Sequence, residues 1–165
     1  MPLRIGVCLM VLAACAGSSN ASRDASDEPA ESAVMADTVR VLAELQNSGW
    51  SERETLIVDD SVAFAEAWSR VHANASPTPP PPVVNFATER VAVIGAGTRS
   101  SGGYVLMPGT ARVVGDTLVV EVVLQTPGAR CGATAALTEP VLVLALRRTS
   151  AAPRITMTER AGPSC

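Results

Sequence analysis

The chain has 165 residues, a length that suits one domain of ordinary size with tails. Its formal net charge is −3, or −4 once Arg4 leaves with the leader described below, and it carries no basic stripe interleaved with aromatic residues. Nucleic acid is therefore not an expected partner. The chain contains no lysine, which excludes Walker-type phosphate loops, Schiff-base chemistry and Ser-Lys nucleophile pairs. Because only 3% of the residues are aromatic, we expect an aliphatic core suited to packed sheets.

The first fourteen residues have the architecture of a secretion signal. Arg4 and the amino terminus form a short positive region, and an apolar run follows at 5–14. This run is too short to span a bilayer, which takes about 20 apolar residues. The tetrapeptide Leu-Ala-Ala-Cys that ends at Cys15 resembles a bacterial lipobox. We therefore expect signal cleavage before Cys15 and a lipid on its thiol, which anchors the protein to a membrane that it does not span.

A tether is expected between the lipid and the folded domain. Residues 16–36 are rich in Ala, Ser, Asp and Glu and show no apolar period, a composition typical of flexible segments. Ala16 stands where an aspartate would resemble an inner-membrane retention signal. We therefore favour the outer membrane of a bacterial envelope, with a single domain at 37–165 facing the periplasm.

Apolar patterns in the domain predict a mostly β, α+β fold with seven or eight strands. Residues 37–46 alternate as a half-buried strand, whereas 90–95 form a continuous apolar run suited to burial on both faces. Gly115-Asp116 is typical of a two-residue hairpin turn. We expect an antiparallel sheet or sandwich, and the further strands are predicted at 54–58, 102–114, 117–126, 133–137, 141–146 and 154–159.

One helix, at about 61–73, is predicted to pack on this sheet. Asp60 can cap its N-terminus, and Glu66 and Arg70 are spaced to pair on its outer face. Residues 74–85 are rich in proline and predict a stiff, extended connector, with a ligand for a proline-reading module as the less favoured alternative. The buried helix face should consist of Phe64, Trp68 and Val71.

Motifs for cofactors, metals and catalysis are incomplete. The run 91–97 looks like the start of a dinucleotide-binding turn, but Ser100 replaces the third glycine and Pro108 interrupts the helix that should follow. His72 is the only histidine, at the end of the expected helix, where it complements carbonyl groups. We therefore expect neither a cofactor, nor a metal site, nor enzymatic activity.

Two of the four cysteines remain available for a disulfide. Cys8 leaves with the signal and Cys15 carries lipid, so Cys131 and Cys165 are left in an oxidising compartment. We expect a bond between them, with two unpaired thiols as the alternative.

Short motifs spread over about residues 50–160 resemble the PrcB C-terminal domain family. The motifs are Val58-Asp59-Asp60-Ser61-Val62-Ala63-Phe64 with Trp68, Val84-Asn85-Phe86, Arg90-Val91-Ala92-Val93, Ser101-Gly102-Gly103-Tyr104, and Pro127-Gly128 with Cys131. Ser101 replaces the usual threonine and Asn85 a common aspartate. The resemblance implies a lipoprotein that associates with and stabilises a secreted protease complex, and it brings no catalytic residues.

Two hypotheses about function follow. The favoured one is a non-enzymatic envelope lipoprotein that binds a protein partner, with a protease complex as the implied partner. The alternative is a structural envelope lipoprotein with no protease partner. A glycine-rich loop is the candidate binding element, with an aromatic anchor and a charged rim, although the same residues could form a tight turn capped by a packed tyrosine. Its residues are Arg99, Ser100, Ser101, Gly102, Gly103 and Tyr104.

Overall fold

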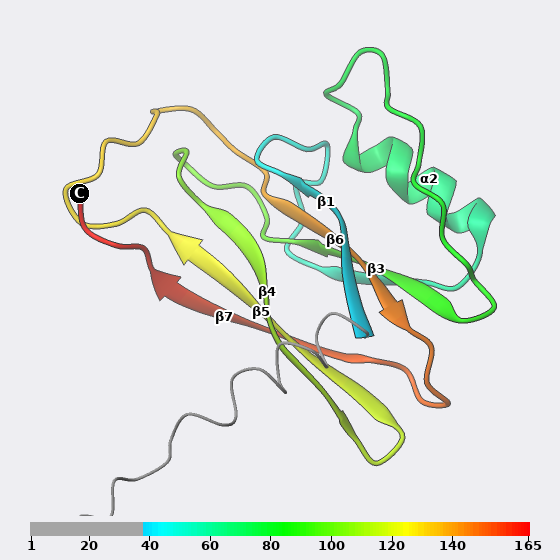
Figure 1. Ribbon diagram of the computed structural model, residues 1–165. Coiled ribbons are helices and arrows are strands. Elements are labelled where there is room, and N and C mark those ends of the chain that lie inside the picture. The colour runs from blue at the N-terminus through cyan, green and yellow to red at the C-terminus, as the bar shows by residue number, and fades with distance from the viewer. Residues whose placement is uncertain (1–37) are drawn as a thin grey trace, which may run out of the picture.

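The computed structural model describes residues 38–165, in which the apolar runs form seven strands and one helix (Figure 1). The expected signal, Cys15 and the tether lie outside the described residues. The mostly β, α+β fold class is confirmed. The elements are β1 (Val39–Leu45), β2 (Thr55–Val58), α2 (Ser61–Val71), β3 (Glu89–Gly95), β4 (Val105–Val114), β5 (Thr117–Thr126), β6 (Val141–Arg147) and β7 (Arg154–Ala161).

The first sheet has the strand order β1-β6-β3-β2, and its neighbouring strands are antiparallel. Its central strands β3 and β6 are buried along nearly their whole length, as their continuous apolar runs predict. They are buried on both faces because α2 covers one face of this sheet and the second sheet covers the other (Figure 1).

The second sheet has the order β4-β5-β7. The hairpin of β4 and β5 forms as predicted, and Gly115 in its turn has a φ of 63°. However, β5 and β7 pair in parallel rather than antiparallel. After β5 the chain crosses to the first sheet, forms β6, and returns, so β7 enters the second sheet in the same direction as β5.

The core consists of two clusters. Between the sheets lie aliphatic side chains from both, as the low aromatic content predicts. Between the first sheet and α2 lies a cluster that contains most of the aromatic rings, where Phe64 and Trp68 meet edge to face with centroids 5.7 Å apart. The aromatic cluster therefore fixes the helix on the sheet, and its main members are Trp50, Val58, Phe64, Trp68, Val71 and Val93.

The helix begins and packs as predicted. The Asp60 carboxylate accepts hydrogen bonds from the amides of Val62 and Ala63, both at 2.9 Å. The C-terminus of the helix is capped by His72, whose Nδ1 lies 3.0 Å from the carbonyl oxygen of Trp68. The Trp68 indole N–H donates to a carbonyl of the proline-rich connector at 2.8 Å, so this connector is fastened to the helix.

Three further details of the expected fold are wrong. Arg70 pairs with Glu52 and Glu54 instead of Glu66, because the segment before β2 runs beside the helix. The alternation of β1 is interrupted by a register shift between Val41 and Ala43, and the Val41 side chain, expected on the buried face, is exposed. Residues 133–137 form no strand, and the Thr134 carbonyl accepts a hydrogen bond from Gly102 of an irregular loop, as described below.

Candidate functional site

The domain has two opposite ends (Figure 1). We define the tether end by residues 38–40, 87–90, 114–117 and 147–154, and the loop end by residues 96–104, 127–140 and 162–165. At the tether end Val39 pairs with Leu146, and the Ser150 hydroxyl bonds to Asp116 in the β4–β5 turn at 3.3 Å. Figure 1 shows that the described chain begins at the tether end and finishes at the opposite, loop end.

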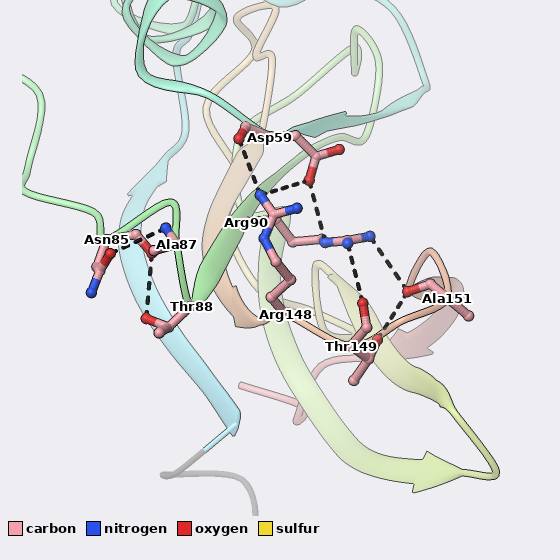
Figure 2. A network of polar contacts seen from close by, with 8 residues as sticks. All are labelled: Asp59, Asn85, Ala87, Thr88, Arg90, Arg148, Thr149 and Ala151. Atoms are coloured by element: carbon pink, nitrogen blue, oxygen red, sulfur yellow. Dashed lines mark hydrogen bonds and ion pairs between the residues drawn. The ribbon is translucent and has the colours of Figure 1, made fainter.

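A polar network holds the tether end together (Figure 2). One carboxylate oxygen of Asp59 lies 3.4 Å from Nε of Arg90 and 3.2 Å from Nη2 of Arg148. The buried Arg90 also donates to the carbonyls of Thr149 and Ala151, at 3.4 and 3.5 Å. These contacts tie β3 to the β6–β7 connection and to the turn after β2. Because the donors point to protein carbonyls and a carboxylate, we assign the network a structural role.

Asn85 and Glu89 form a second polar contact at this end. The Asn85 side-chain oxygen accepts from the Ala87 amide at 3.1 Å, so the asparagine supplies the acceptor that this turn needs. Partial burial raises the pKa of the Glu89 carboxyl, but the Asn85 amide and the Arg40 guanidinium, at 3.0 Å each, lower it by more. The pKa of Glu89 therefore lies below its ordinary value, and the pair with Arg40 persists at neutral pH.

At the loop end, the candidate binding loop is paired with the segment before β6. Arg99 and Thr138 exchange two backbone hydrogen bonds, at 2.8 and 3.0 Å. The Thr138 hydroxyl donates to the Ser101 carbonyl at 2.8 Å, and the Gly102 amide donates to the Thr134 carbonyl at 2.9 Å. The two segments therefore brace each other and form one surface.

The two glycines of this loop occupy positions where a larger side chain would clash or strain the backbone. A Cβ on Gly102 would lie 2.3 Å from the Thr134 hydroxyl, a distance that no ordinary contact allows. Gly103 has a φ of +84°, in the left-handed region that favours glycine, and faces Pro127. Both glycines are explained by the tight turn and the close approach of the neighbouring segment.

Tyr104 and Arg99 are engaged within the domain. Tyr104 is half-buried and packs against the core between the sheets. The Arg99 guanidinium lies 5.3 Å from the centre of its ring, donates to the Ala96 carbonyl at 2.9 Å, and lies 3.6 Å from the Glu159 carboxylate. These contacts support a packing role for the tyrosine and leave the arginine as a partly covered rim residue.

The loop end exposes the large apolar side chain of Leu137. It is 72% exposed and lies beside a hollow of about 370 Å³, whose walls also include Asn47, Asn74, Thr134 and Glu139. The sequence analysis missed it because an apolar residue between Ala136 and Thr138 fits an alternating strand. A single exposed leucine is common on protein surfaces, so its exposure marks an accessible position on the braced loop and does not by itself indicate a binding site.

The expected disulfide is confirmed. Cys131 and Cys165 are joined, which fastens the C-terminus to the loop after β5. A hollow of about 230 Å³ beside the bond is also lined by Gly103 and Pro127. The structure thus brings the candidate loop and the disulfide together at one end of the domain.

Residues 38–165 contain neither a metal-binding cluster nor a membrane-spanning helix. No three His, Cys, Asp or Glu side chains in this range gather where they could hold a metal ion. No helix in the same range is long and apolar enough to cross a membrane.

Comparison with known protein families gives a match in the central part of the domain. The model of the family described as PrcB C-terminal matches this part of the chain from Arg90 to Arg147. Residues 90–147 resemble the PrcB C-terminal family. No curated protein and no solved structure matches the chain. The resemblance to the PrcB C-terminal family is therefore confirmed, over a shorter stretch than the motifs suggested. The PrcB C-terminal stretch includes β3, β4, β5 and β6 and both braced segments of the loop end.

Proposed function

We propose that this protein is a non-enzymatic lipoprotein of the bacterial cell envelope that binds a protein partner through its loop end. The partner is a secreted protease complex, which the lipoprotein stabilises or regulates. The observation that carries the proposal is the PrcB C-terminal match, because it covers the strands that form the loop end and the two segments that brace each other there.

The geometry of the domain supports this arrangement. A lipid on Cys15 would be connected through residues 16–37 to the tether end, where the described chain begins (Figure 1). An outer-membrane anchor at that end would leave the opposite loop end directed into the periplasm. The loops are hydrogen-bonded to each other, so ordering them on binding costs little entropy.

Site-specific crosslinking tests the binding surface. A photo-crosslinking amino acid at Leu137 should capture a protein partner in intact envelopes, and mass spectrometry of the product should identify protease-complex subunits. The matched control is the same amino acid at Val114, an exposed valine at the tether end. Equal products from both positions, or only lipids and abundant envelope proteins from Leu137, would favour a structural envelope lipoprotein without a protease partner.

Cys15→Ala tests the anchor. The variant should remain unprocessed or become soluble, because the thiol is the lipid acceptor at the expected signal boundary. Membrane fractionation and the mass of the mature N-terminus provide the measurement, with Cys8→Ala as the control that should be processed normally. Unchanged membrane fractionation of Cys15→Ala would contradict the lipoprotein assignment.

A further inference from the structure

The strand β2 lies at the edge of the first sheet and leaves half of its backbone groups unpaired. The Gly95 amide donates to the Glu54 carbonyl at 2.9 Å, and Leu56 lies opposite Val93. In an antiparallel ladder, pairs that exchange hydrogen bonds alternate with pairs that do not. Leu56 therefore bonds to β3, whereas the N–H and C=O groups of Thr55 and Ile57 point away from the sheet.

An apolar hollow lies beside this open edge. It has a volume of about 350 Å³ and is bounded by Leu56 and Val58 of β2 and by Ala63 and Ala67 of α2. Leu56 is 40% exposed although it stands on the face that α2 covers. A segment added to the edge of β2 would place alternate side chains on this face, where the hollow can accept an apolar one.

The charge around the hollow is negative. Glu66 and Arg70 both line it, and Arg70 is paired with Glu52 and Glu54, so the nearest charges are three carboxylates and one guanidinium. Arg53 is paired with Glu159 of β7 at 3.0 Å, and Arg70 lies between two of the carboxylates. Glu66 lines the hollow and, within residues 38–165, takes part in no ion pair. A ligand at this edge should therefore carry positive charge.

We propose that β2 binds an extended segment of a partner protein by strand addition. The segment pairs with the backbone of Thr55 and Ile57, places an apolar side chain in the hollow, and presents a lysine or arginine to Glu66. A second copy of this chain fits less well, because pairing two β2 edges would bring two acidic rims together. This edge is separate from the loop end, and its test does not use the loop-end partner.

A phage-displayed library of random twelve-residue peptides, selected on the full-length chain, supplies the ligands. Amide exchange measured by NMR then tests whether a selected peptide binds at the edge of β2. Selected peptides should alternate apolar and polar residues and contain lysine or arginine. On addition of the most enriched peptide, exchange of the Thr55 and Ile57 amides should slow at least about tenfold, whereas the Leu56 amide is already protected in the free chain. Failure to enrich such peptides, or unchanged exchange at both positions, would overturn the proposal.

Two matched variants locate the binding to the backbone edge. Thr55→Pro removes an outward N–H and leaves the ladder to β3 intact, so it should weaken peptide binding about tenfold. Thr55→Val keeps the N–H and should change binding less than about twofold. Glu66 lies on the exposed face of α2, so Glu66→Lys should weaken the binding of basic peptides without altering β2. Equal binding by all these variants would refute strand addition, and slowing of Thr55 exchange with protein concentration alone would assign the edge to self-association instead.

Discussion

Trp50→Ala should lower the free energy of unfolding by about 3–5 kcal/mol, the cost typical of removing a fully buried tryptophan. Trp50 is 1% exposed and belongs to the aromatic cluster between the first sheet and α2. The Arg70 guanidinium lies 3.8 Å above its ring, so truncation also removes a cation–π contact. Chemical denaturation followed by circular dichroism measures the loss.

Two controls separate this packing effect from a general effect of substitution near the helix. Trp50→Phe keeps an aromatic ring in the site and should retain a substantial part of the stability. Val62→Ala changes a side chain that is 69% exposed on the same helix and should alter stability by less than about 0.5 kcal/mol. A loss below about 1 kcal/mol for Trp50→Ala would show that the cluster does not fix α2 on the sheet.

Local patterns predicted the elements whose environment is uniform along their length. β3 and β6 are buried on both faces, so their apolar runs need no knowledge of the partner strand. The helix start depends on local hydrogen bonds, because the Asp60 carboxylate accepts from the amides of Val62 and Ala63, two and three residues along the chain. Such features are encoded within a few residues, and the sequence alone identifies them.

Features set by distant contacts could not be predicted in this way. The direction of β7 depends on the passage of the chain through the first sheet, which no local pattern records. Trp50 lies outside every strand and helix and shows no periodicity, so its place in the core was not expected. Residues 133–137 have a strand-like composition, yet they join no sheet, and the Thr134 carbonyl accepts instead from Gly102 of the adjacent loop.

The candidate loop illustrates the same limit at the level of the site. Its sequence permitted both a projecting binding loop and a tight turn. Which of these two structures forms depends on Thr134 and Thr138, more than thirty residues away, because they bond to Arg99, Ser101 and Gly102. With Tyr104 packed inside, the exposed apolar side chain of the loop end is Leu137, at a position where the sequence indicated a strand.

The second large effect is expected from the disulfide. Replacing Cys131 and Cys165 together by serine should lower the free energy of unfolding by about 3–4 kcal/mol, because the bond closes a loop with a sequence separation of 34 and restricts the unfolded chain. Reductant should lower the stability of the unmodified protein by the same amount and leave the double variant unchanged. Equal stability of the two proteins without reductant would show that the bond contributes nothing.

The position of the bond predicts where the folded state should loosen. β7 ends at Ala161, and the Gly162 amide bonds to the Thr126 carbonyl at 2.9 Å; beyond this contact the tail is held by the disulfide and by a hydrogen bond from the Cys165 amide to the Ala129 carbonyl at 3.3 Å. In the double variant, amides of residues 127–133 and 162–165 should exchange faster, whereas those of β3 and β6 should report only the global loss. Since Gly103 faces Pro127 at the start of this loop, the same variant should weaken capture of a partner from Leu137 even under conditions where the domain remains folded.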